Sequence, residues 1–337
     1  MKNLNAILYG QQWKSLIALA AIVLLIPFFV HAPYLFTLMI LIGIYCVITI
    51  GLSMLVGYAG QISLGHAAFF GLGAYTSGIL TTKLSLSPWL AMGVGVVLTF
   101  VIAYLIGIPI LKLKGHFLAL ATLGFNTIVY IVLMGASDLT GGALGLHGIP
   151  ALSLAGLDLG NPLYFYYFVW AVVGLIILFS KNVVRSHVGR LLRSIHDSEI
   201  AAQTLGVNVS AYKVSIFAIS AAYASLAGSI YAHFIQFIAP PTFHISFSIL
   251  LLIMVMVGGS YSIYGAILGT AIIMFLQELI RYVGHNYLHI SGPVEIVVYG
   301  FIIILVMLFA PRGFVSIFSG LMRTASRSKE TTEVKGA

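Results

Sequence analysis

The feature that most limits what this chain can fold into is a series of ten apolar runs separated by short polar segments. Most of these runs approach the roughly 20 residues that a helix needs to cross a bilayer. In lipid, a helix satisfies its own backbone hydrogen bonds along such a run, so the sequence predicts an all-α, polytopic transmembrane helical bundle. The predicted spans are residues 15–30, 34–56, 62–82, 88–111, 116–135, 163–180, 214–237, 245–257, 263–282 and 294–310.

Composition supports this class, because only 7% of the residues are charged and 61% are hydrophobic. Soluble domains carry about 25% charged residues. Run 245–257 is too short for a straight crossing, so it is tilted, half-buried or re-entrant. We therefore predict about ten spans, and eight if this run and one other element do not cross.

The Lys and Arg residues of the chain are predicted to lie mostly on one side of the membrane. In the ten-span arrangement, fourteen of the sixteen Lys and Arg residues fall on one side of the membrane, and Lys83 and Arg281 fall on the other. The positive-inside rule makes the cation-rich side cytoplasmic. Both termini are then cytoplasmic. The parts are the N-terminus 1–14, the membrane domain 15–310 with an outer loop 136–162 and a cytoplasmic loop 181–212, and the basic tail 311–337.

The net charge of +8 does not indicate nucleic acid, because the cations lie at the ends of apolar runs and not on one continuous patch. They are typical of topology signals and contacts with anionic membrane lipid.

No pattern in the sequence indicates catalysis. A nucleotide-binding P-loop, an H-E-x-x-H motif and a Cys/His cluster with metal spacing are all absent, and Cys46 is the single cysteine. We expect no catalytic residue, no metal and no cofactor bound by this chain. Glu278 and Glu295 lie near the outer ends of their runs, so no carboxylate is expected at mid-membrane. An ion-coupled carrier would place one there, and we infer that the driving energy comes from elsewhere.

The cytoplasmic loop predicts a short helix near Ala201. Asp197 or Ser198 can cap its start, and Gly206 and Asn208 can end it. Ala201 and Ala202 would give this helix a low profile, where an ordinary solvated helix has longer polar side chains. We expect another protein to dock there.

Polar side chains within the apolar runs are candidates for a substrate path. Ser63 and His66 need either a partner or a wet cavity, so they line a path or form a buried hydrogen bond between helices. The other candidates are Asn126, Thr127 and the outer-loop residues Thr140, Gly141 and Gly142.

Two further patterns concern packing. Segments 57–65 and 258–265 both place Gly and Ser before a Gly-rich helix, which fits an internal repeat and equally fits two unrelated helix starts. Run 214–237 has a small residue at every fourth position, which predicts close helix contact within the chain or with a partner subunit.

Several of these motifs carry a family resemblance. Glu199-Ile-Ala201-Ala202 followed by Gly206 resembles the E-A-A…G coupling motif of ABC importer permeases. Within that class the chain is similar, from about residue 34 to 316, to the LivM-type membrane subunits of branched-chain amino acid permeases. The segments that carry this similarity are 57–70, 111–115, 140–142, 206–213 and 310–314.

The resemblance implies an importer in the bacterial cytoplasmic (inner) membrane. Its other parts would be a second homologous permease subunit, an extracytoplasmic substrate-binding protein and two cytoplasmic ATPase subunits that use ATP and Mg. Glu199, Ala201, Ala202 and Gly206 would be this chain's contact with an ATPase.

Three alternatives stay open at this point. Urea permeases of the same class share most of these motifs, so urea or short amides are possible substrates. A secondary carrier driven by an ion gradient is the second alternative. A membrane-embedded enzyme is the third, and it has the least support.

Overall fold

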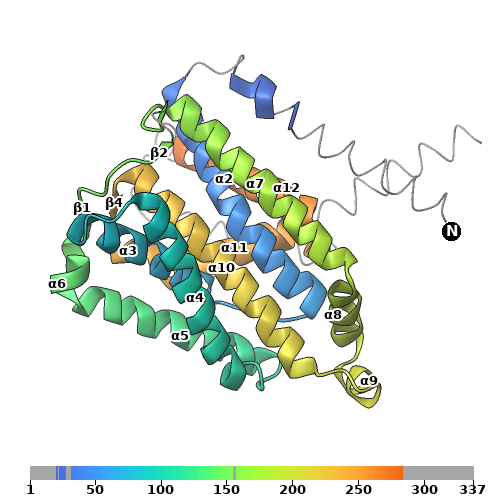
Figure 1. Ribbon diagram of the computed structural model, residues 1–337. Helices are drawn as coiled ribbons and strands as arrows, with labels where there is room; N and C mark the ends of the chain where they lie inside the picture. Colours follow the sequence, from blue (N-terminus) through green and yellow to red (C-terminus); the bar gives the residue numbers. More distant parts are fainter. Residues whose placement is uncertain (1–19, 22, 28–31, 155–156, 284–337) are drawn as a thin grey trace, which may run out of the picture.

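The computed structural model describes residues 20–21, 23–27, 32–154 and 157–283. Within them the chain is a bundle of long helices that run between two ends (Figure 1). Helix α2 is extended by one π-helical turn, η1 (Met54–Tyr58). The long helices are α2 (Pro33–Ser53), α3 (His66–Lys83), α4 (Pro88–Ile110), α5 (His116–Gly135), α7 (Pro162–Arg185), α10 (Val209–Ile235), α11 (Ile245–Gly258) and α12 (Ile263–Val283).

The short elements lie at the two ends of the bundle (Figure 1). One end, here called the α9 end, carries α8 (His187–Asp197) and α9 (Glu199–Thr204). The opposite end carries α6 (Ser137–Thr140), the 3₁₀ turns η2 (Gly142–Leu144) and η3 (Pro240–Phe243), and the strands β1 (Leu146–His147), β2 (Ser153–Leu154), β3 (Leu157–Asp158) and β4 (Phe237–Ile238). Strand β1 pairs antiparallel with β4, and β2 pairs antiparallel with β3.

The predicted helical class is confirmed, with one correction. The prediction was all-α, whereas the described part contains these four two-residue strands. Their pairing has a physical reason, since a Gly- and Pro-rich loop cannot use a helix to satisfy its backbone groups. Pairing Leu146 with Ile238 ties the predicted outer loop to the end of α10.

Six helices of the described part are long and apolar enough to cross a membrane: α2 with η1, α4, α5, α7, α10 and α12. Helix α3 has 18 residues but is more polar, and α11, with 14 residues, is short, as its sequence predicts. Apart from residues 20–21 and 23–27, the predicted spans 15–30 and 294–310 lie outside the described residues. The total of ten spans therefore stays a prediction.

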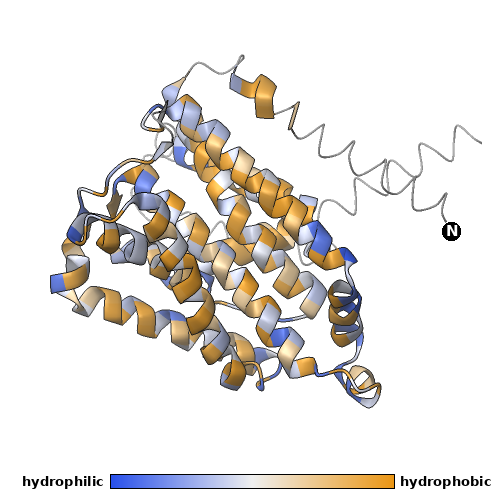
Figure 2. Ribbon diagram, viewed as in Figure 1, coloured by the Kyte–Doolittle hydropathy of each residue, from blue (hydrophilic) through white to orange (hydrophobic). Residues whose placement is uncertain are grey.

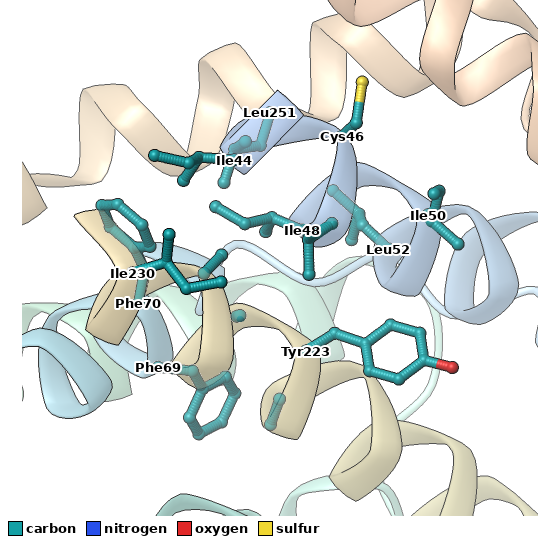
Figure 3. Packing of buried hydrophobic residues seen from close by; sticks show 14 of the residues in the cluster. Ile44, Cys46, Ile48, Ile50, Leu52, Phe69, Phe70, Tyr223, Ile230 and Leu251 are labelled. Atoms are coloured by element: carbon teal, nitrogen blue, oxygen red, sulfur yellow. The ribbon is translucent and has the colours of Figure 1, made fainter. Parts of the chain in front are cut away.

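Helices α2 and α10 form the centre of the bundle. Helix α10 packs against α2, α3 and α4, and α2 also packs against α7, α11 and α12. Figure 3 shows side chains from α2, α3, α10 and α11 meeting in this core, among them Ile48, Phe70 and Ile230. The close contact predicted from small residues is confirmed, because a methyl group added at Gly73 of α3 would overlap the backbone of Ser225.

Charged residues are concentrated at the two ends of the bundle. Hydrophobic residues cover the lengths of the helices, while hydrophilic and hydrophobic residues alternate on α8 (Figure 2). Lys83 and Arg281 end helices that run toward the opposite end, where Arg281 pairs with Glu278 at 3.5 Å. The described cations of the α9 end are Lys112, Lys114, Lys181, Arg185, Arg190, Arg193 and Lys213. The predicted sorting of cations therefore holds along the described part of the bundle.

Candidate functional site

A pair of short helices, α8 and α9, connects α7 to α10 at the α9 end (Figure 1). The sequence predicted one helix in this loop, and the structure has two. The Ser186 side chain caps the extra helix, α8, by accepting a hydrogen bond from the Val188 amide. Leu192 and Ile195 are buried on one face of α8, so this helix is held by packing as well as by its cap.

Helix α9 begins as predicted and ends differently. Ser198 caps it by accepting from the Ala201 amide at 3.3 Å. At its end Gly206 takes the left-handed conformation (φ 81°), which glycine adopts at little cost, and the Val207 amide closes the turn onto Ala202. Asn208 does not end α9 but caps α10, since its side chain accepts from the Ala211 amide.

The outward surface of α9 carries large apolar side chains beside the exposed polar residues Gln203 and Thr204. The prediction of two exposed alanines holds for Ala201 only, because Ala202 is 2% exposed and packs with Ile195 and Val209. Two larger side chains are presented outward instead: Ile200 is 72% exposed and Leu205 is 82% exposed. Both lie outside the candidate spans, in the segment between α7 and α10. They are the side chains best placed to contact a partner.

Glu199 joins three segments of the chain. Its carboxylate pairs with the ammonium of Lys213 on α10, whose side chain is only 6% exposed. The other carboxylate oxygen lies 3.7 Å from Lys114, in the turn between α4 and α5. Glu199 therefore holds α9 against α10 and also connects it to the start of α5. The ATPase contact predicted for Glu199 stays a prediction beside this role within the chain.

The two Gly-rich segments meet beside α8. The Tyr58 hydroxyl donates to the Tyr261 carbonyl at 2.9 Å, and Ser53 donates to the Ser260 carbonyl at 2.8 Å. The Tyr261 hydroxyl in turn bonds to Nε2 of His196 on α8 at 2.5 Å. Segments 57–65 and 258–265, similar in sequence, thus form one surface on which α8 rests.

The polar candidates Ser63 and His66 both have partners. The Ser63 hydroxyl accepts from the Gly65 amide at 3.3 Å. Nε2 of His66 bonds to the Ser220 hydroxyl on α10 at 2.7 Å. The buried hydrogen bond between helices that the sequence allowed for His66 is present, while Nδ1 has no partner among the described residues and the path-lining role stays a prediction.

Neighbouring helices also supply side chains to the start of α3. The Leu64 amide donates to the Thr122 hydroxyl of α5 at 2.9 Å, and the Ala67 amide donates to the Ser248 hydroxyl of α11 at 2.9 Å. The N-terminal amides of a helix have no partner within the helix, so the Ser248 hydroxyl takes the place of a cap at Ala67, and the Thr122 hydroxyl holds the turn that precedes the helix. Sequence reasoning missed them because a buried Ser or Thr in an apolar run is typical of many helix contacts.

The neighbours Asn126 and Thr127, predicted together, differ in the structure. Thr127 is exposed, and its hydroxyl donates to the Leu123 carbonyl of its own helix at 3.1 Å. Asn126 is 1% exposed, and neither its amide nitrogen nor its amide oxygen has a partner among the described residues. Only Asn126 faces the interior of the bundle.

The outer-loop candidates Thr140, Gly141 and Gly142 build a turn at the opposite end. The Thr140 hydroxyl donates to the Leu133 carbonyl at 2.7 Å and accepts from the Gly142 amide at 3.1 Å. Gly141 is left-handed (φ 78°), and a side chain there would overlap the carbonyl of Gly145. This geometry gives the three residues a role in shaping the loop.

A bundle with six helices long and apolar enough to cross a membrane, counted among the described residues, is typical of a multi-pass membrane protein. The sequence model described as branched-chain amino acid transport system / permease component matches residues 34–309. The chain belongs to this family, and it is a multi-pass protein of the inner membrane.

Individual relatives agree with the family. The chain is 30% identical over 294 residues to the high-affinity branched-chain amino acid transport system permease protein LivM of Salmonella typhimurium, covering 80% of this chain and 67% of the relative. The LivM protein of Escherichia coli is similar to the same extent. The LivH permease protein of Escherichia coli is 26% identical over 291 residues, with 80% of this chain and 90% of the relative covered. No solved structure matches the chain.

Proposed function

We propose that this chain is the LivM-type permease subunit of an ATP-driven ABC importer for branched-chain amino acids. The observation that carries the proposal is helix α9, which bears the E-A-A…G pattern and presents Ile200 and Leu205 outward in a chain of this permease family. An apolar pair on a helix at the end of a membrane bundle is suited to bind a groove on another protein.

The α9 end faces the cytoplasm in this proposal. Its support is the excess of Lys and Arg at that end, which the positive-inside rule assigns to the cytoplasm. The turn with Thr140 then lies outside, where a substrate-binding protein would deliver the amino acid. A homologous subunit resembling LivH, to which this chain is itself similar, would complete the path.

The chain itself binds no nucleotide in this proposal, and ATP and Mg are used by two partner ATPases. An ATPase that grips α9 moves it, and Glu199 passes the movement on through its two ion pairs. Lys213 carries it to α10 in the core, and Lys114 carries it to α5. Transport then follows from alternating access, since the same helices separate first on one side and then on the other.

The test is the substitution Leu205→Glu in the complete importer. Leu205 is 82% exposed, so the substitution leaves the fold of the chain intact. A carboxylate buried at the interface would weaken ATPase binding by at least about 2 kcal/mol, roughly 30-fold. We expect loss of ATPase copurification and of ATP-dependent uptake in proteoliposomes.

The matched control is Leu144→Glu, because Leu144 is 83% exposed at the opposite end. This variant should retain its ATPases. Normal ATPase binding and uptake by Leu205→Glu would contradict the proposal. Uptake by the wild-type chain alone, without nucleotide, would support the ion-coupled alternative instead. The named relatives are amino acid permeases, so urea is not the favoured substrate.

A further inference from the structure

Two buried amide side chains of the described part, Gln61 and Asn126, have no hydrogen-bond partner there, and Asn126 is the one that lies on a helix, α5. Asn126 is 1% exposed, yet both polar atoms of its amide lack a partner among the described residues. A buried amide without hydrogen bonds lowers the stability of a fold, and a leucine of similar size would not. An amide that the described part of the chain leaves without a partner, at the interior of a transporter, suits a ligand.

The position of Asn126 is well defined. The buried face of α5 comprises Leu118, Thr122, Asn126, Val129 and Leu133, and α5 packs against α3, η3 and α11. Thr122, one turn before Asn126, receives the Leu64 amide at the start of α3. The amide therefore lies inside the bundle, about one turn along α5 from the N-terminus of α3.

Helix α5 is also the least enclosed of the candidate spans in the described part. It has the smallest buried share of the six candidate spans. Gly115, just before it, has a positive φ (56°) with ψ −127°, and there is open space around its α-carbon. The adjacent Lys114 pairs with Glu199, so α5 is connected to α9. A solute reaches Asn126 only when α5 shifts, and this ion pair is one contact through which α9 acts on the start of α5.

The chemistry of the interior limits what can bind. The buried polar side chains of the described spans carry hydroxyl, amide and imidazole groups, and the buried cation Lys213 is paired with Glu199 at the α9 end. A solute with a net charge would find no counter-charge there. A primary amide donates through its nitrogen and accepts through its oxygen. It can therefore donate to a carboxylate and accept from an ammonium group of the same neutral zwitterion.

We propose that the Asn126 amide is a binding subsite for the head group of a zwitterionic α-amino acid. Nδ2 donates to the carboxylate of the amino acid, and Oδ1 accepts from its ammonium group. This inference rests on the proposed function. It adds the residue that recognises the amino and carboxylate groups, which all amino acid substrates of the importer share. Leu118, Val129 and Leu133 lie on the same buried face of α5 as Asn126. The apolar side chain of the amino acid would pack against these residues.

The test compares Asn126→Leu with Thr127→Val in the assembled importer, using leucine as the transported probe. Asn126→Leu should leave the thermal stability of the chain unchanged or raise it, because it removes an unsatisfied buried amide. It should keep its ATPases and basal ATP hydrolysis, and leucine uptake should fall at least 10-fold. Thr127→Val should transport like the wild type, since its hydroxyl bonds only to its own helix.

Two results would overturn the inference. The first is normal leucine uptake by Asn126→Leu. The second is a loss of thermal stability in Asn126→Leu that accounts for the loss of uptake, which would mean that the amide supports the fold. Failure of the proposed function looks different, because the wild-type importer would then show no ATP-dependent leucine uptake at all.

Discussion

The ion pair between Glu199 and Lys213 predicts that substituting Glu199 destabilises the chain more than substituting Lys213 does. Glu199→Gln leaves the Lys213 ammonium, on a side chain only 6% exposed, without a counter-charge. Removing one partner of a buried pair costs about 3–5 kcal/mol. The Glu199 side chain is 28% exposed, so water screens part of the interaction, and we expect a destabilisation of about 2–3 kcal/mol.

Lys213→Met has a smaller expected effect. It removes the buried charge and keeps most of the apolar stem, while Glu199 stays partly solvated beside Lys114. Because this substitution leaves no buried charge unpaired and Glu199 keeps its contact with the exposed Lys114, we expect a loss of only about 1 kcal/mol. The double variant should be no less stable than Glu199→Gln alone, because no buried charge is then left unpaired.

The assay is reversible unfolding of the chain by SDS in mixed micelles, applied to the wild type, both single variants and the double variant. A difference of 2 kcal/mol corresponds to roughly 30-fold in the unfolding equilibrium and is well within its range. The reasoning is refuted if Lys213→Met is as damaging as Glu199→Gln, or if the two losses simply add in the double variant.

Two further predictions concern the core and the opposite end. Gly73→Val should destabilise the bundle by about 1–3 kcal/mol, because the Ser225 backbone blocks the new side chain. Gly93→Ala should have no such effect, because Gly93 faces open space on α4. Unfolding by SDS measures the stability of both variants. His233 bonds through Nδ1 to the Pro150 carbonyl and through Nε2 to the Ser77 hydroxyl, both at 2.8 Å. His233→Leu should therefore speed hydrogen exchange around residues 149–154 by about 10-fold or more, since each bond is worth about 1 kcal/mol; unchanged exchange would mean that other contacts hold this loop.

The helices of the bundle were largely predictable from the sequence, because apolar runs set their positions. Run 116–135 matches α5 at both ends, and runs 88–111 and 263–282 match α4 and α12 to within one residue. The prediction was less accurate where polar residues extend a helix. Helix α7 continues past residue 180 to Arg185, and α10 begins at Val209, five residues before its predicted start.

The predicted site was less complete, for a physical reason. Patterns along one segment reveal caps such as Ser198, but contacts between distant segments require the packed bundle. The pairing of Glu199 with Lys114 joins residues far apart in sequence, and nothing local to either residue indicates it. Likewise, Asn126 and Thr127 are neighbours in sequence, and only the orientation of α5 decides that one is inside and the other outside.

The exposed apolar pair on α9 also has a consequence for the chain in the cell. Ile200 and Leu205 remain in water for as long as no partner covers them. Chaperones and proteases recognise such side chains on newly made proteins, so a chain synthesised in excess would be removed while an assembled one is protected. The same two residues would then set the ratio in which the components of the transporter accumulate.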